Sequence, residues 1–244
     1  MKIHIIPVNY GVFYMWVEII LASVWGGIVA TDTTAFLQIM VSRPMVACSI
    51  VGLILGNFQL GFTIGIILEL LYISELPIGG ANFAEGNVGA TAAAAIGILT
   101  VRQIPEREYI IIVCALLLSA AISWLGGILV RFMRHINGKV VDVILKRKLI
   151  TPMHVNLGQL VGIMLAFFLG FLSLFVSCFV FINLLPLLIH QAPLKLDVIF
   201  RPIIGGLLAV GCVYLIHIFW AQGERRRLFA IGVCLGALWI LIGI

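Results

Sequence analysis

Charged residues are scarce in this chain of 244 residues: Asp, Glu, Lys and Arg make up 10% of it, whereas 63% is hydrophobic. A soluble domain carries about a quarter charged residues, because it needs a hydrated surface. Too few charges remain here to cover such a surface, so lipid is the solvent for much of the chain. The apolar runs are long and continuous rather than alternating, which predicts membrane helices and not a membrane barrel.

Several motifs are also absent. The sequence contains neither GxxxxGK[ST] nor GxGxxG, and no loop is long enough for a kinase or phosphocarrier domain, so nothing indicates ATP-driven transport. The five cysteines lie in apolar runs without CxxC spacing, which is typical of small buried hydrophobic residues. The five histidines lack the spacing of a metal site. We therefore expect no metal, no cofactor and no catalytic residue, and a chain that is not an enzyme by itself.

The C-terminal half predicts full transmembrane helices, from long apolar stretches at 109–130, 157–189, 203–220 and 228–244. The first apolar stretch, 12–30, is not followed by the small-residue cleavage pattern of a signal peptide, so we interpret it as a retained membrane segment.

The N-terminal half is less regular. Its apolar stretch 45–76 is interrupted near Gly56 and Asn57. Each part is too short to cross a bilayer, which favours a re-entrant hairpin or broken helix, with one long tilted helix as the alternative. The Ala-rich run 90–101 is also too short and resembles the returning arm of a second hairpin. The sequence thus predicts an all-α, polytopic membrane protein with a hairpin-rich, substrate-binding part (1–101) and a part of transmembrane helices (109–244).

Basic residues are concentrated in two segments, 131–148 with six Lys or Arg and 223–227 with three Arg. The net charge of +5 therefore reflects membrane orientation and not nucleic-acid binding. Both segments are predicted to be cytoplasmic loops, with two crossings between them. The loops near Arg102 and Lys195 then face outward. An acidic partner protein docking at 131–148 is a further hypothesis.

The most informative stretch is ELLYISELPIGGANFAEGNVG, which begins at Glu69. Glu69 itself lies inside an apolar run, where an ionisable side chain needs a partner or a polar cavity. Glu85 lies with Asn82 and Asn87 in a Gly-rich break. Carboxylates and amides are the groups that pair with sugar hydroxyls, so these four residues are the predicted substrate-binding set. The alternatives are a Glu69 carboxylate bonded only to a hairpin backbone and an ordinary exposed loop around Glu85.

Five further polar residues have less specific interpretations. Asp32 resembles a helix N-cap, and Gln38 a polar contact on a core helix. Glu75 either caps a helix or faces water. With Asp32 and Gln38, it is a candidate for a supporting position behind the site. Arg43 is expected to anchor a helix end, and Glu18 to bind a partner subunit or an internal cation.

The run from Ser42 to Ile96 resembles the signature region of the IIC component of the mannose–fructose–sorbose family of phosphotransferase transporters. An Arg-Pro pair opens it, and a small-residue helix follows. The pattern GxxxGxxxE then ends at Glu69, and a Pro-Ile-Gly-Gly break precedes Glu85. The sequence departs from the better-known mannose members at Glu85, where they have Pro-Asp, and at Ser42, where they have His.

This resemblance implies a bacterial inner-membrane complex of IIC with a second membrane subunit, IID, usually trimeric, whose hairpin core moves like an elevator. Soluble IIA and IIB proteins would pass phosphate through their own histidines to the incoming sugar, a hexose. Glu69 would be the sugar-contacting glutamate, and Glu85 would match the acidic residue after the break. A secondary transporter for another small solute and a membrane assembly subunit without substrate are the alternatives.

Overall fold

The computed structural model describes most of the chain, and every regular element in that part is a helix. The prediction of an all-α membrane protein is confirmed. Four of the described helices, α1, α5, α6 and α7, are long and apolar enough to cross a membrane. The described residues are 8–36, 38–73, 85–146, 151–193, 195–220 and 226–234. The helices are α1 (Val8–Thr34), α2 (Pro44–Ile54), α3 (Phe58–Tyr72), α4 (Gly86–Gln103), α5 (Glu108–Leu145), α6 (Pro152–His190) and α7 (Lys195–Trp220), with a 3-10 turn at Pro105–Arg107.

The broken hairpin is present as α2 and α3. The chain turns between them at Gly56, which has a φ of +71° that favours glycine. Asn57 then begins α3, and its side-chain oxygen accepts a hydrogen bond from the backbone N–H of Leu60 at 3.1 Å. The two helices have 11 and 15 residues. Both are shorter than the roughly 20 residues that a crossing needs. The tilted single helix is therefore excluded.

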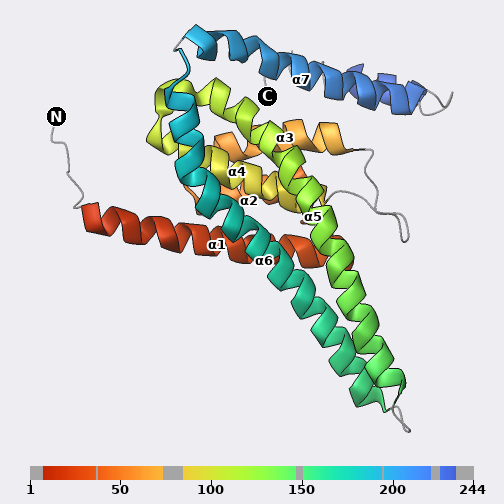
Figure 1. Ribbon diagram of the computed structural model, residues 1–244. Helices are drawn as coiled ribbons and strands as arrows, with labels where there is room; N and C mark the ends of the chain where they lie inside the picture. The colour runs from red at the N-terminus through yellow and green to blue at the C-terminus, as the bar shows by residue number, and fades with distance from the viewer. Residues whose placement is uncertain are drawn as a thin grey trace.

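Helix α4 lies at the centre of the molecule (Figure 1), packed against α1, α2, α3, α5 and α6. Every residue from Val88 to Val101 is buried. Most of these side chains are small, which lets the neighbouring backbones approach closely. The helix is longer than the predicted run 90–101, because Gly86–Gly89 and Arg102–Gln103 are helical as well. With 18 residues, α4 is about 27 Å long at 1.5 Å per residue.

Helices α5 and α6 run side by side and extend beyond the other helices as a two-helix arm (Figure 1). They have 38 and 39 residues, or about 57 and 58 Å. We define the arm as residues 131–145 of α5 and 152–163 of α6. The prediction that 131–148 forms a loop is therefore wrong, because the helix continues to Leu145. This segment contains no proline, and its single glycine, Gly138, does not break the helix.

The outer helices complete the packing. Helix α1 lies along α6, and the contact depends on Gly26 and Gly170, because a Cβ atom on Gly170 would collide with the carbonyl oxygen of Gly26. Helix α7 packs on α3 and α5. Cys48 and Cys178 are buried as predicted, whereas Cys212 and Cys234 are exposed in the isolated chain, contrary to the expectation for all five cysteines. Within the described residues none forms a disulfide.

Candidate functional site

The glycine pattern on α3 explains where Glu69 lies. Gly61, Gly65 and Glu69 are spaced by four residues, so they share one face of the helix. A Cβ on Gly61 would lie 2.5 Å from the Cys48 carbonyl oxygen, and one on Gly65 would lie 2.8 Å from the Pro44 carbonyl oxygen. Each turn of α3 therefore faces an earlier part of α2. Glu69, one turn further on, reaches the beginning of α2.

The Glu69 carboxylate binds the N-terminal end of α2. Its Oε2 accepts a hydrogen bond from the backbone N–H of Met45 at 3.3 Å, and its Oε1 lies 3.5 Å from the Arg43 guanidinium. The side chain keeps 21% of its surface exposed. The positive end of the helix dipole and the arginine both stabilise a negative charge there. Contact with the hairpin backbone, the alternative raised for this residue, is thus present, and the carboxylate also remains accessible. Arg43, the residue before α2, lies at a helix end as expected.

Asp32 organises the connection between α1 and α2. It lies in the last turns of α1 and is 3% exposed. Its two oxygens accept hydrogen bonds from the backbone N–H groups of Ile39 at 2.8 Å and Ser42 at 2.9 Å. The predicted N-cap role is therefore wrong, since α1 continues through Thr34 and the carboxylate binds the chain that follows the helix.

The connector itself has an unusual backbone. Gln38 and Met40 have φ values of +53° and +67°, in the left-handed region that few residues other than glycine adopt. Such conformations cost about 1–3 kcal/mol each and occur preferentially at functional sites. Gln38 is exposed and lies in this connector, so its predicted place on a core helix is wrong.

Glu85 lies directly before α4 and is 7% exposed. Its backbone N–H donates to the Ser123 carbonyl oxygen at 2.9 Å. A Cβ atom on Gly126 of α5 would lie 2.8 Å from the Glu85 Cβ, so only glycine fits at that position. The carboxylate is hydrogen-bonded to the Thr33 side chain and interacts with the positive charge of Arg134. The interpretation of Glu85 as part of an ordinary exposed loop is therefore wrong.

Asn87 and Ser123 extend this cluster. The Asn87 amide donates to the Thr33 hydroxyl at 3.3 Å, which places Thr33 between Asn87 and Glu85. The Ser123 side chain is 2% exposed, and its hydroxyl has no hydrogen-bond partner among the described residues. A buried hydroxyl without a partner is unusual in a native protein. The hydroxyl faces Gly89 of α4, whereas the Ser123 carbonyl oxygen accepts the Glu85 N–H.

The two carboxylates are linked by a path in which contacts alternate with residues adjacent in the sequence, and no direct contact between them is seen in the described residues. Asn82 and Glu75, also predicted for the site or its support, lie outside the described residues. Three contacts form this path, Glu69 with Arg43, Asp32 with the Ser42 N–H, and Glu85 with Thr33. Arg43 follows Ser42 and Thr33 follows Asp32 in the sequence, which joins the three contacts.

Ser123 and Arg134, which both interact with Glu85, were not among the residues predicted for the site. The signal for Ser123 was its spacing from Ser119, four residues earlier in an apolar helix, together with the following Gly126. That pattern marks a polar stripe on α5, and Ser119 indeed contacts the Tyr72 hydroxyl of α3 at 2.9 Å. Arg134 gave no signal, because its electrostatic interaction with Glu85 depends on how far α5 continues as a helix.

The fold and the site together define a multi-pass helical membrane protein with polar side chains gathered at broken helices, an arrangement typical of transporters. Residues 16–241 match the family described as "PTS system sorbose-specific iic component". The chain belongs to this family, the IIC components of the mannose–fructose–sorbose phosphotransferase transporters, which are membrane permease subunits. The family resemblance of the signature region is thereby confirmed.

The individual proteins similar to this chain match it either over a part of its length or at low sequence identity. The "PTS system sorbose-specific EIIC component" of Lacticaseibacillus casei is 31% identical over 83 residues, which are 34% of this chain and 30% of that protein. Among solved structures, one titled "Structure of membrane protein" has a TM-score of 0.63 at 18% identity, covering 92% of this chain and 95% of that one. A mannose transporter ManYZ, solved in complex with microcin E492, has a TM-score of 0.51 at 18% identity, covering 91% and 86%. At these identities the structures support the fold.

Proposed function

We propose that this chain is the sugar-translocating subunit of a phosphotransferase transporter, and that it binds a hexose at Glu69, Glu85, Asn87 and Asn82. The observation that carries the proposal is the path of three contacts that links Glu69 to Glu85 through a connector with two left-handed residues. The names of the relatives, which mention sorbose and mannose, agree with a hexose.

The proposed chemistry follows from the groups present. Glu69 and Glu85 accept hydrogen bonds from sugar hydroxyls, and the Asn87 amide both donates and accepts. The part of the chain up to residue 101 contributes these groups, and the transmembrane helices from residue 109 onward frame them. Arg43 and Thr33 keep the two carboxylates in position when no sugar is present.

The proposal includes the partners of this family. The chain assembles with an IID membrane subunit, as a trimer of the pair, and an elevator-type movement of the hairpin core carries the sugar across the inner membrane. A cytoplasmic IIB protein phosphorylates the sugar. In this arrangement the basic segments at 131–148 and 223–227 face the cytoplasm, in accordance with the positive-inside rule.

Uptake into membrane vesicles tests this function. The complex, supplied with phosphoenolpyruvate and the soluble IIA and IIB proteins, is expected to accumulate phosphorylated hexose and to be insensitive to an uncoupler. Glu85→Gln should lower the rate about tenfold or more, since a hydrogen bond to a charged group contributes about 1.5–3 kcal/mol. Glu106→Gln is the matched control, because Glu106 is exposed before α5, away from the proposed site.

A secondary transporter is the second candidate, and the burial of Glu85 is the observation that favours it, because a buried carboxyl group is suited to carry a proton. Uptake that an uncoupler abolishes, and that proceeds without phosphoenolpyruvate, would establish this candidate and exclude the first.

A further inference from the structure

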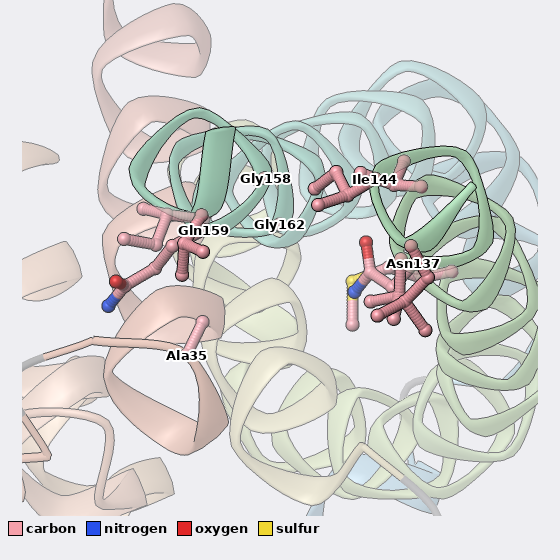
Figure 2. Close-up of a pocket in the computed structure, with 12 residues that line it drawn as sticks. Ala35, Asn137, Ile144, Gly158, Gln159 and Gly162 are labelled. Atoms are coloured by element: carbon pink, nitrogen blue, oxygen red, sulfur yellow. The ribbon is translucent and has the colours of Figure 1, made fainter. Parts of the chain in front are cut away.

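The arm contains a large apolar hollow that the proposed transport function does not use. A cavity of about 520 Å³ lies between α5, α6 and the end of α1. Figure 2 shows Asn137 and Ile144 of α5 facing Gly158 and Gly162 of α6, with Ala35 of α1 at the border. Asn137 and Gln159 are the two polar side chains of its lining, and the remaining lining is apolar.

A second hollow, of about 320 Å³, lies on the other flank of the same helix pair. Val140, Ile144 and Gly158 line both hollows, because they form the ridge where the two helices touch. A Cβ on Gly158 would lie 2.6 Å from the Cδ1 of Ile144, so the glycine allows this contact. The smaller hollow has an apolar wall with Lys139 and His154 beside it.

The surface of the arm combines cations with exposed apolar side chains. Arg131, Arg134, Lys139 and Lys146 outweigh one acid, Asp142, along this end of α5. Exposed apolar side chains lie between them: Phe132 (64%), Val141 (51%), Val143 (60%) and Leu145 (62%). Such interleaving is typical of helices at the membrane interface, where cations reach the phosphates while apolar groups enter the acyl region. A face that docks an acidic soluble protein does not need these apolar groups.

The position of the arm agrees with the membrane boundary. The apolar span of α1 ends at Thr33, and Ala35, two residues later, lines the larger hollow. The hollow therefore begins where a membrane-crossing segment ends. Helix α5, at about 57 Å, is almost twice as long as the roughly 30 Å hydrocarbon core, so its last turns lie in or beyond the headgroup layer.

We propose that the arm is a binding site for anionic phospholipids of the surrounding leaflet. The acyl chains enter the larger hollow at its membrane end, beside Met133 and Ile163, and the Asn137 amide lies at the depth of the glycerol esters. Lys139 and the neighbouring cations bind the phosphate group. Bound lipid would fill space between α1 and the arm that side chains leave open, and would thereby fix the arm against the membrane helices.

Two pairs of variants test this site. Lys139→Gln removes the cation beside the smaller hollow, and Lys146→Gln removes the cation that directly follows α5 and lines neither hollow. Gly162→Leu fills the larger hollow, since the nearest atoms to its Cβ belong to the Asn137 side chain at 3.8 Å. Gly138→Leu adds the same side chain to the same arm, where nothing lies within 4 Å.

The experiment is native mass spectrometry of the full chain, purified with the membrane subunits that accompany it. Phosphatidylglycerol is titrated against phosphatidylcholine with the same acyl chains. Wild type is expected to retain phosphatidylglycerol preferentially. Lys139→Gln should lower that preference about fivefold, the effect of one lysine near an anionic surface, whereas Lys146→Gln should lower it less. Gly162→Leu should lose bound lipid of both kinds, and Gly138→Leu should not.

Equal retention of the two lipids by wild type would overturn the proposal, as would equal effects of the two variants within either pair. Unchanged lipid retention in Lys139→Gln, together with slower IIB-dependent phosphorylation, would assign the arm to a protein partner instead. These results do not depend on sugar binding, so the lipid site and the transport function can fail separately.

Discussion

At the scale of single residues, Arg102 of α4 contacts both α1 and the end of α2, and no sequence pattern predicted these contacts. Its Nη1 lies 2.6 Å from the Glu18 carboxylate on α1, and its Nη2 donates to the Leu55 carbonyl oxygen at 2.5 Å. Leu55 directly follows α2, at the tip of the hairpin. Glu18, for which a partner subunit or a cation was expected, thus has an internal partner. One side chain at the end of α4 links α1 to the hairpin.

Arg102→Met is expected to destabilise the folded protein by about 1–3 kcal/mol, because it leaves the Leu55 carbonyl group without its partner. Glu18→Gln should change stability by less than about 1 kcal/mol, since the pair is partly exposed and the carbonyl contact remains. Thermal unfolding in detergent measures both. Equal effects of the two variants would mean that the ion pair, and not the carbonyl contact, matters.

A second prediction concerns Arg107, which is 8% exposed. Its guanidinium donates to the carbonyl oxygens of Ile189 and, at 2.6 Å, Ala192, at the C-terminal end of α6. Arg107→Gln should lower the unfolding temperature more than Arg131→Gln, an exposed arginine on the arm, because it leaves buried carbonyl groups unpaired. If the two variants unfold at the same temperature, α6 does not need this cap.

At the scale of elements, the hairpin depends on close backbone contact between α2 and α3. Gly61→Ala is expected to destabilise the protein by several kcal/mol or to prevent assembly, because its Cβ would meet the carbonyl oxygen of Cys48 and not a flexible side chain. Gly138→Ala, in open space on α5, should be neutral or stabilising by up to about 1 kcal/mol. Yield and elution profile in size-exclusion chromatography, followed by thermal unfolding, distinguish them. A stable Gly61→Ala protein would contradict the tight packing of the hairpin.

The elements also show which sequence predictions were reliable. The hairpin was predictable, since Gly56 and Asn57 divide an apolar run into two parts that are each too short to cross. The lengths of α4 and α5 were not. The prediction placed helix ends where the apolar pattern ended, at Ala90 and Val130, whereas the backbone continues helical through polar residues. Helix length follows from hydrogen bonding and propensity, and apolar patterning shows only which part faces lipid or the core.

The same limit applies to the candidate site. Glu69 was singled out because an ionisable group in an apolar run requires a partner, and Glu85 because it lies with Asn82 and Asn87 in a Gly-rich break. The partners themselves, Met45 and Thr33, depend on how α3 packs on α2 and how α4 packs on α1. Asp32 was misassigned for the same reason, since a carboxylate next to two threonines is typical of an N-cap, and only the structure shows that α1 continues past it.

At the scale of the whole molecule, orientation in the membrane is a prediction. In a chain whose native cysteines are replaced by serine, Gly138→Cys on the arm should react with a membrane-impermeant maleimide only after the cytoplasmic side is exposed. Glu106→Cys, before α5, should react from the outside. The reverse pattern would overturn the orientation derived from the basic segments.

The most direct measurement is calorimetric binding of hexoses to the full chain purified with its IID partner, comparing wild type with Glu69→Gln, Glu85→Gln and the control Glu106→Gln. The account predicts that at least one hexose binds wild type and the control with equal affinity. Either of the other two variants should weaken binding about tenfold or more, as expected for losing a charged hydrogen-bond acceptor. A folded complex that binds no hexose, or that binds one equally well in all four forms, would contradict the assignment of this site.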